Sequence, residues 1–237
     1  MADIKLITFD LDNTLWNVEV VIKRAETRLR EWIHQRVPDY GTRIPPEAVL
    51  DLRNAVLADH PELRHDLSRL REEILFRAIS HCGYGEREAR RLARDAFGIF
   101  LDARHEVEFF EGALETLELL SRDYLLGALT NGNADIARLK LDRYFRFGYS
   151  AASVGAAKPA PEMFHAALTH AGLIPGQAIH VGDHLHDDIH GASQVGMHTI
   201  WVNLERHDLP DDAATPSHTV HLIEDVPTGI LEIAQSV

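Results

Sequence analysis

The 237-residue sequence has little cysteine and no long apolar run. Its single cysteine, Cys82, cannot form a disulfide within the chain, and its place in the apolar pattern of a helix favours a packed thiol over a nucleophile. No apolar run reaches the roughly 18 residues that a membrane span requires, and residues 1–5 lack the basic and apolar parts of a secretory signal. We therefore expect a cytoplasmic protein in a reducing compartment, without a membrane partner.

Positive charge is scarce as well. The chain has 24 Lys and Arg against 37 Asp and Glu, a formal net charge of −13, and only four of the basic residues are lysines. An acidic chain of this kind is a poor candidate for binding nucleic acid or an anionic membrane surface. Residues 16–105 contain 16 basic and 15 acidic residues, so the negative charge belongs to the rest of the chain. An anionic ligand therefore needs a site built for it.

Short apolar segments alternate with helical patterns over much of the chain. The expected strands are residues 4–9, 125–129, 147–150, 178–181 and 198–202. The helices expected between them are residues 113–121, 134–141, 161–171 and 187–195, the second with Asn133 as its N-cap. Alternation of this kind is typical of βαβ units. It predicts an α/β fold with a Rossmann-like parallel sheet as its core.

Residues 16–105 interrupt this alternation, because their apolar positions follow helical spacing throughout. The four expected helices are residues 18–37, 46–58, 61–82 and 89–101. A helical block of this size is too large for a simple crossover loop. We therefore expect residues 16–105 to be an inserted four-helix cap domain, and residues 1–15 and 106–237 to form the catalytic core.

Acidic and polar residues follow three of the expected strands at their carboxyl ends. They are Asp10 and Asp12 after the first, Thr130, Asn131 and Gly132 after the second, and Asp183, Asp187 and Asp188 after the fourth. Each group on its own is ordinary turn or helix-cap chemistry. In a parallel sheet, however, ligands bind beyond the carboxyl ends of the strands. The coincidence of all three groups at strand ends therefore predicts a functional site.

Carboxylates gathered at one edge repel each other and repel an anionic substrate. Two unit charges 4 Å apart interact by about 1 kcal/mol in water and by about 4 kcal/mol at an effective dielectric constant near 20. A magnesium ion resolves this conflict, because it binds carboxylates together with a substrate phosphate. A carboxylate that is left over can act as a nucleophile and form an aspartyl-phosphate. Thr130 and Lys158 offer a hydroxyl and an ammonium group to the phosphate oxygens, and a solvated loop lysine is the alternative for Lys158.

Four segments resemble, in order, the four motifs of the haloacid dehalogenase superfamily, subfamily I, whose members carry a helical C1 cap after the first motif. They are residues 9–15 (FDLDNTL), 130–132 (TNG), 158–164 (KPAPEMF) and 181–192 (VGDHLHDDIHGA). The resemblance covers essentially the whole chain. It implies a hydrolase with a Rossmann-like core and a helical cap.

The resemblance also implies a role for each polar residue. Asp10 would be the nucleophile that attacks phosphorus, and Asp12 would protonate the leaving alkoxide and later activate water. Thr130 and Asn131 would bind the phosphoryl group of the substrate. Lys158 would bind the same group and stabilise its charge.

One magnesium ion is implied as the cofactor. Its ligands would be Asp10, the backbone carbonyl of Asp12, and Asp183, with Asp187 and Asp188 in the outer shell. Position 187 is often Asn in this family. The sequence therefore leaves open which of Asp187 and Asp188 lies nearer the metal.

Three other functions remain open. Family members that dehalogenate 2-haloacids need no metal or leaving-group acid and look unlike this chain at position 12, so Asp12 favours a phosphatase. His186 and His190 have the i, i+4 spacing of a zinc-binding helix, but no Glu follows the first His. A non-enzymatic binding module is the third, and it would need neither a nucleophile nor an acid.

The cap sets the substrate, and its sequence is less explicit. Arg24, Arg28 and residues 64–71 look similar to the bacterial branch that hydrolyses flavin mononucleotide and the ribitylamino-uracil phosphate of riboflavin synthesis. We expect a small phosphorylated metabolite as the partner, in contact with Trp16 and Arg69. A solvated helix face is the alternative for residues 64–71, and a general sugar-phosphate or nucleotide phosphatase, like phosphoglycolate phosphatase, is the alternative activity. The chain is expected to act as a monomer or a homodimer.

Overall fold

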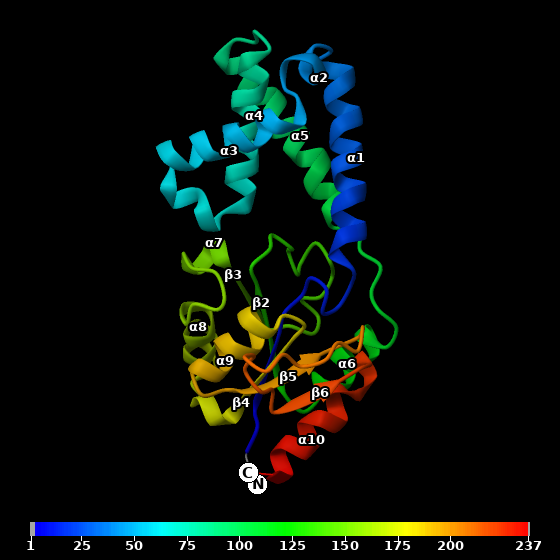
Figure 1. Cartoon of the computed structure of the whole chain (residues 1–237). Helices are drawn as coiled ribbons and strands as arrows, with labels where there is room; N and C mark the ends of the chain where they lie inside the picture. Colours follow the sequence, from blue (N-terminus) through cyan, green and yellow to red (C-terminus); the bar gives the residue numbers. More distant parts are fainter. Residues whose placement is uncertain (1–2, 237) are drawn as a thin grey trace. The chain divides into compact units, whose positions relative to one another are not determined.

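The computed structural model describes residues 3–236, which form two compact units (Figure 1). One unit runs up to Asn17 and resumes at Val107, and the other spans Val18–Glu106. Residues 1, 2 and 237, which belong to the predicted catalytic core, lie outside the described residues. The helical unit therefore begins and ends slightly later than the predicted cap, residues 16–105.

Trp16 lies in the first unit, although the sequence assigns it to the cap. Its backbone forms β-bridges with Asp12 and Phe109, and its side chain is fully buried. The backbone N–H of Phe110 also donates to the carbonyl of Leu15 at 2.8 Å. These contacts attach the chain on both sides of the helical unit to the first unit.

The first unit is built on a six-stranded sheet in which neighbouring strands are parallel. The strands are β1 (Leu6–Phe9), β2 (Leu125–Thr130), β3 (Phe147–Ser150), β4 (Ala178–Gly182), β5 (His198–Val202) and β6 (His218–Val220). Their order is β3-β2-β1-β4-β5-β6, so β1 lies between β2 and β4. The predicted α/β fold with a Rossmann-like parallel sheet is confirmed. Strand β6 is not predicted from the sequence, because its three residues form no apolar pattern of their own.

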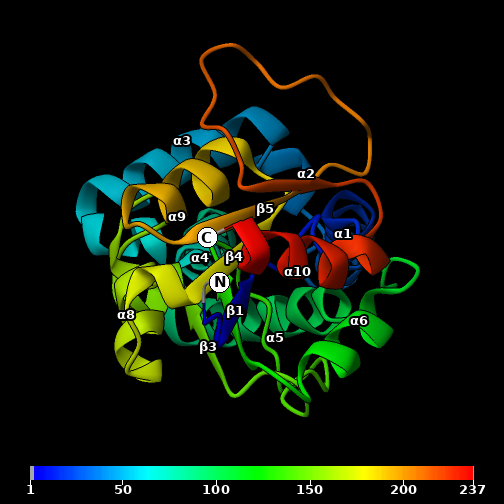
Figure 2. The same ribbon diagram turned by 90° about the horizontal axis from the view of Figure 1, so that it is seen from below.

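Helices cover both faces of this sheet (Figure 2). Helices α8 (Glu162–Ala171) and α9 (Gly191–Gln194) lie on one face, and α6 (Ala113–Leu120) and α10 (Val226–Ser236) lie on the other. The shorter elements are α7 (Ala151–Val154), the 3-10 helices η2 (Pro175–Gln177) and η4 (Ile223–Asp225), and the π-helix η3 (Leu185–His190). Phe164 and Leu168 of α8 pack with Leu6 and Leu129 of the sheet. Because protein interiors are closely packed, this layer holds the strand ends in fixed positions.

The second unit contains helices and turns only. Its elements are α1 (Val18–Arg36), α2 (Tyr40–Arg43), α3 (Pro46–Asp59), the 3-10 helix η1 (Pro61–His65), α4 (Leu67–His81) and α5 (Glu86–Arg104). Helix α5 packs against α1 and α4 around a core that includes Leu29, Ile79, Phe100 and Cys82. The Cys82 thiol is therefore packed, and burial raises its pKa. Among residues 3–236, no helix is both long and apolar enough to cross a membrane.

Residues 134–141 do not form the predicted helix, and residues 136–140 form turns instead. The Asp135 side chain accepts the backbone N–H of Ala137 at 2.8 Å, and Lys140 adopts the left-handed conformation with φ 58°. A short polar side chain that takes a backbone N–H competes with the helix, and a left-handed residue interrupts it. Asn133 therefore does not cap a helix.

Two other predicted helices differ from the structure in their first turns. The third cap helix is divided at Asp66, whose side chain accepts the N–H of Arg69 at 3.0 Å and so caps α4. The helix predicted from residue 187 begins at Leu185, and its first part is the π-helix η3. Within η3, the rings of His186 and His190 stack on each other, with centroids 5.5 Å apart.

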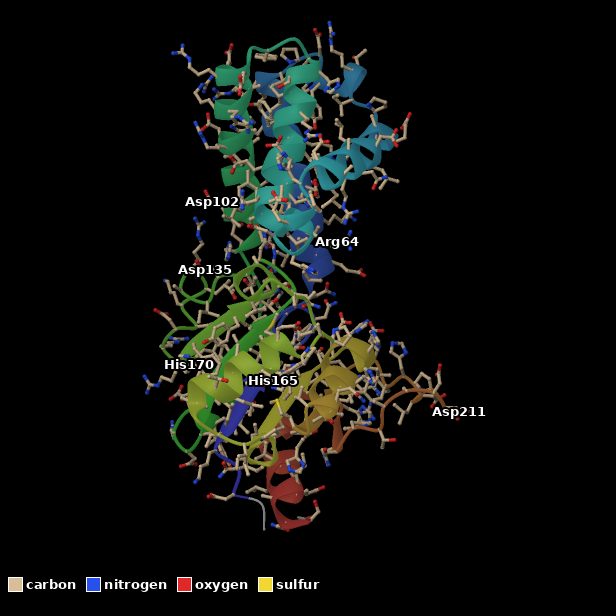
Figure 3. The ribbon with its side chains drawn as sticks, turned by 90° about the vertical axis from the view of Figure 1, so that its left-hand side faces the viewer. Arg64, Asp102, Asp135, His165, His170 and Asp211 are labelled. Atoms are coloured by element: carbon tan, nitrogen blue, oxygen red, sulfur yellow. The ribbon has the colours of Figure 1, made fainter. Side chains whose placement is uncertain are left out.

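Much of the negative charge of the first unit is exposed to solvent. Figure 3 shows Asp211 at the outer end of the segment between β5 and β6, and Asp208 and Asp212 nearby in sequence are exposed as well. Among the acidic residues at positions 3–236, only Asp10 and Asp188 are buried. Because burying a charge is costly, these two carboxyl groups need partners.

Candidate active site

The two buried acids follow neighbouring strands of the sheet. Asp10 directly follows β1, and Asp188 lies in η3, after β4. With Asp183, which also follows β4, they form a cluster in which one carboxylate oxygen of each residue lies within 4.8 Å of the others. Strands β1 and β4 pair in parallel, so their carboxyl ends lie at the same edge of the sheet. The predicted convergence of these residues is thus what the structure shows.

Lys158 supplies the positive charge of this cluster. Its Nζ atom donates to Asp10 Oδ1 at 2.7 Å, to Asp188 Oδ1 at 2.6 Å and to the backbone carbonyl of Leu129 at 2.7 Å. These bonds use all three N–H groups of an ammonium. The side chain is 1% exposed, so Lys158 is not a solvated loop lysine. Burial disfavours its charge, but Asp10 and Asp188 more than offset this and raise the pKa of Lys158 above its usual value.

Asn131 fixes the backbone of Lys158. Its Oδ1 accepts the Lys158 N–H at 2.7 Å, and its Nδ2 donates to the Lys158 carbonyl at 3.0 Å and to Asp187 Oδ2 at 3.3 Å. The side chain predicted to bind substrate is therefore engaged in joining the loop after β2 to the loop that carries Lys158. Thr130 is buried at the end of β2, and its Oγ1 accepts the N–H of Gly132 at 2.9 Å. The hydroxyl of Thr130 keeps its own hydrogen for donation.

His180 supports Asp188 from within the sheet. It lies fully buried in β4, with Nε2 at 3.0 Å from Asp188 Oδ1 and Nδ1 at 2.8 Å from Thr8 Oγ1. Because Nε2 faces a carboxylate, we assign the proton to it, and Nδ1 then accepts the Thr8 hydroxyl. Burial lowers the pKa of His180, so the ring is neutral and adds no charge to the cluster.

Asp188 is held in one orientation by several donors. Its Oδ2 accepts the backbone N–H of His184 at 3.0 Å, in addition to the bonds at Oδ1. Burial disfavours its charge, but Lys158 and His180 more than offset this and hold the pKa of Asp188 below its usual value. Residue 182 is glycine for a steric reason, because a Cβ atom there would lie 2.3 Å from the carboxyl carbon of Asp188. Asp188 is therefore a fixed, ionised carboxylate.

Thr14 connects Asp10 with Asp183. Its Oγ1 lies 3.2 Å from Asp10 Oδ2 and 3.1 Å from Asp183 Oδ1, and the residue is fully buried. A hydroxyl has one hydrogen, so it donates to one carboxylate at a time. Neither Thr14 nor His180 is among the predicted site residues. The signals for them are the place of Thr14 in the first motif and the occurrence of a polar residue, His180, in an apolar strand.

Three carboxylates share this site with one ammonium group. Burial raises the pKa of Asp10 well above its usual value despite Lys158, and burial together with Asp188 raises the pKa of Asp183 to about 6. Full ionisation leaves an excess of negative charge that a divalent cation balances. The ligand atoms are carboxylate oxygens, which Mg²⁺ prefers. Asp10, Asp183 and Asp188 therefore fit the predicted magnesium ion.

The structure distinguishes Asp187 from Asp188. Asp188 belongs to the carboxylate cluster, whereas Asp187 accepts a hydrogen bond from Asn131. Asp12 lies outside the cluster too, and its Oδ1 accepts the indole N–H of Trp16 at 2.9 Å. The carboxyl group of Asp12 is thus separate from the candidate metal ligands. A metal contact through its backbone carbonyl stays a prediction.

The zinc alternative has no support in the described part of the chain. Across residues 3–236, Asp10, Asp183 and Asp188 form the only group of three or more potential ligands close enough to share a metal. His186 and His190 stack on each other but belong to no such group. Zinc sites in proteins take at least three protein ligands, with nitrogen and sulfur preferred.

Comparison with known proteins identifies the family to which this site belongs. The profile of the haloacid dehalogenase-like hydrolases matches residues 4–196. The chain belongs to this family. The family expectation from the four motifs is therefore confirmed, and the protein is a hydrolase.

Relatives of this haloacid dehalogenase-like hydrolase include phosphatases and a dehalogenase. The chain is 32% identical over 209 residues to the 5-amino-6-(5-phospho-D-ribitylamino)uracil phosphatase YigB of Escherichia coli. The aligned residues cover 88% of this chain and 87% of that protein. The chain is 31% identical over 218 residues to the glyceraldehyde 3-phosphate phosphatase of Pyrococcus furiosus, covering 85% and 81%. The crystal structure of a 2-haloacid dehalogenase from Pseudomonas syringae is 40% identical, with a TM-score of 0.93 and coverage of 97% and 99%.

The two residues predicted to contact the substrate, Arg69 and Trp16, differ in exposure: Arg69 lines a pocket, and Trp16 is buried. Arg69 of α4 is among the residues that line a pocket of about 240 Å³ in the helical unit. The others are His60, Leu63, Glu72, Glu73 and Arg90. Arg24 and Arg28 of α1 form ion pairs with Glu106. A substrate contact of Arg69 stays a prediction, whereas the ring of Trp16 is fully buried and donates to Asp12.

Magnesium binding is expected to weaken as the pH falls below about 6. Burial and the neighbouring Asp188 raise the pKa of Asp183 to about 6, so below this pH a proton competes with the cation for the Asp183 oxygens. Each ligand carboxyl group that must lose its proton should raise the apparent dissociation constant of Mg²⁺ about tenfold per pH unit below its own pKa. Isothermal titration calorimetry of the metal-free protein with Mg²⁺, from about pH 5 to about pH 8, measures this.

The control for this titration is Asp123→Asn, which changes an exposed acid outside the cluster. It should keep the wild-type pH profile, whereas Asp183→Asn should bind Mg²⁺ weakly at every pH. An Mg²⁺ affinity that is constant over the whole pH range would show that these carboxylates are not the metal site.

Proposed function

We propose that this hydrolase is a magnesium-dependent phosphatase that cleaves a small-metabolite phosphomonoester through an aspartyl-phosphate on Asp10. The observation that carries the proposal is the buried pair of Asp10 and Lys158, 2.7 Å apart, beside a second carboxyl group, Asp12, that lies outside the metal cluster. Phosphoryl transfer needs a nucleophile, positive charge at the phosphoryl oxygens and a proton donor for the leaving group. This arrangement supplies all of them.

In the first step, an Asp10 carboxylate oxygen attacks phosphorus, and the bond between phosphorus and the leaving oxygen breaks. Asp12 transfers its proton to that oxygen, so an alcohol departs instead of an alkoxide. The Thr130 hydroxyl donates to the phosphoryl oxygens, and the Lys158 ammonium stabilises their negative charge. When bound, magnesium neutralises the carboxylates and thereby admits an anionic phosphate to the site.

In the second step, Asp12 takes a proton from a water molecule that attacks the phosphorus of the aspartyl-phosphate. The bond between phosphorus and the Asp10 oxygen breaks, and inorganic phosphate leaves. Asp10 is again a carboxylate and Asp12 again carries a proton. Both groups are thus ready for the next substrate.

Dehalogenation is the second candidate function, because a 2-haloacid dehalogenase is 40% identical to this chain. Displacement of a halide by Asp10 needs no proton donor, since a halide ion is a weak base. The carboxylate cluster would also repel the carboxylate of a haloacid. The presence of Asp12 and of the cluster therefore favours the phosphatase.

For the substrate, we propose a ribityl phosphate, either the ribitylamino-uracil phosphate of riboflavin synthesis or flavin mononucleotide. The support is the 32% identity, over 88% of this chain, with a phosphatase named for the first of these compounds. Another relative is named for glyceraldehyde 3-phosphate. A general sugar-phosphate or nucleotide phosphatase is therefore the alternative.

A panel of substrates tests the proposed activity. With Mg²⁺ we expect inorganic phosphate to be released from phosphomonoesters, fastest from the two ribityl phosphates, and EDTA should lower the rate at least about 100-fold. A short 2-haloacid in the same panel should release no halide. The proposal fails if no ester is hydrolysed, as expected for a binding module, or if halide is released at a rate that EDTA does not change.

A further inference from the structure

Trp16 makes a direct hydrogen bond to the carboxyl group of Asp12. The indole Nε1 atom lies 2.9 Å from Asp12 Oδ1. The two residues are joined by a tight turn, in which the backbone N–H of Asn13 donates to the carbonyl of Trp16 at 2.8 Å and Asn13 adopts φ 62°. This turn directs the two side chains toward each other.

The indole ring is itself fixed by its surroundings. Trp16 is fully buried, and its ring meets the ring of Phe109 edge-on, with centroids 5.6 Å apart and an angle of 84° between the planes. A β-bridge between Trp16 and Phe109 fixes the backbone beneath the rings. An edge-on contact of this kind is a favourable aromatic arrangement. The N–H group therefore has one direction, and that direction is toward Asp12.

An indole is an unusual partner for a carboxyl group that transfers protons. It has one hydrogen-bond donor and no acceptor, and it does not ionise at ordinary pH. It therefore cannot take or give the transferred proton, and its hydrogen bond holds Oδ1 in place. Fixing Oδ1 also fixes the direction of the second carboxyl oxygen, Oδ2, because the carboxyl group is planar.

We propose that Trp16 is a positioning residue that aims the acid-base carboxyl group of Asp12 at the leaving oxygen. The inference rests on the proposed phosphatase function and replaces the expectation that Trp16 contacts the substrate. A displacement of about 1 Å in a reacting group is enough to lower a rate about 100-fold. The bond thus matters most in the step in which Asp12 delivers its proton.

The test measures the hydrolysis of two substrates by the wild-type enzyme and by Trp16→Phe. This variant keeps a buried aromatic ring and removes the N–H. An alkyl phosphate has an alkoxide leaving group that needs a proton, whereas para-nitrophenyl phosphate has a phenolate that departs without one. The ratio kcat/KM is used because it reports the steps up to the formation of the aspartyl-phosphate. For Trp16→Phe we expect kcat/KM to fall about 10- to 100-fold on the alkyl ester and less than about threefold on the aryl ester.

Matched variants separate positioning from general damage. A second indole N–H at the site, that of Trp201, donates to the backbone carbonyl of Asp183 at 2.9 Å. Trp201→Phe removes this N–H, and the variant should lower kcat/KM by the same factor on the alkyl ester and on the aryl ester. Asp12→Asn should show the same split between esters as Trp16→Phe, but larger. Adding Trp16→Phe to Asp12→Asn should cause no further loss, because the two changes remove the same function.

A second measurement needs no change at Trp16. The ¹⁵N spectra of the wild-type protein and of Asp12→Leu are compared, because this substitution removes the acceptor of the Trp16 hydrogen bond. One indole N–H signal should differ in position between the two spectra. Equal losses on both esters in Trp16→Phe, or an indole spectrum unchanged in Asp12→Leu, would overturn the inference while leaving the phosphatase intact. Failure of wild-type enzyme to hydrolyse either ester would overturn the proposed function and the inference with it.

Discussion

Asp10→Asn is expected to lower kcat for phosphate ester hydrolysis at least about 10⁴-fold, because it removes the nucleophile and keeps the shape of the side chain. An amide oxygen does not form a stable bond to phosphorus, so only the slow direct attack of water remains. Steady-state release of inorganic phosphate at saturating Mg²⁺ measures the loss. Asp123→Asn, the matched change at an exposed acid, should keep wild-type activity.

The Asp10→Asn protein should still fold. Lys158 keeps its bonds to Asp188 and to the backbone carbonyl of Leu129. Burial raises the pKa of Asp10 well above its usual value, so a charge at this position is unfavourable in the metal-free protein and its removal costs little. Thermal unfolding with EDTA checks this. A folded Asp10→Asn variant that retains more than about a tenth of the wild-type rate would exclude Asp10 as the nucleophile.

Lys158→Met is expected to damage stability and activity together. Without the ammonium, the ionised Asp188 loses a buried partner at 2.6 Å, and removing one partner of a buried ion pair costs about 3–5 kcal/mol of unfolding free energy. The loss of a fixed positive charge at the phosphoryl oxygens should lower kcat by a further factor of about 10²–10³. Denaturant unfolding with EDTA and steady-state kinetics with Mg²⁺ measure the two effects separately.

Magnesium should restore part of the stability of Lys158→Met, since a bound cation compensates the same carboxylates. The control is Lys5→Met, at an exposed lysine of the same unit, which should change the free energy of unfolding by less than about 0.5 kcal/mol. If Lys158→Met is as stable and as active as Lys5→Met, then Lys158 is not the cation on which this site depends.

The positions of Asp10, Thr130 and Asp183 could be predicted from the sequence because each lies at the carboxyl end of a strand or directly after it. The carboxyl ends of neighbouring parallel strands lie at the same edge of a sheet. Because β1 and β4 are such neighbours, Asp10 and Asp183 are expected to lie close together, as they do. The rule does not reach a residue inside a strand. His180 is such a residue, and its bond to Asp188 depends on η3 folding back onto β4.

Details of orientation also lay beyond the sequence. Asn131 follows β2 as expected, but its amide is engaged with the backbone of Lys158, a contact between segments far apart in the chain. Trp16 and Asp12 are close in sequence, yet their hydrogen bond depends on the left-handed Asn13 between them. Local competition explains the missed turn at Asp135, because its side chain takes a backbone N–H that a helix would have used.

The central claim is that Asp10 carries the phosphoryl group during the reaction. Asp12→Asn with para-nitrophenyl phosphate tests it most directly, because this ester forms the aspartyl-phosphate without an acid but its hydrolysis still needs the base. After mixing and acid quenching, mass spectrometry of the peptide that contains Asp10 should show a phosphoryl group on that residue, at close to one per protein. Release of nitrophenolate with an unmodified Asp10, or with the phosphoryl group on another residue, would contradict the account.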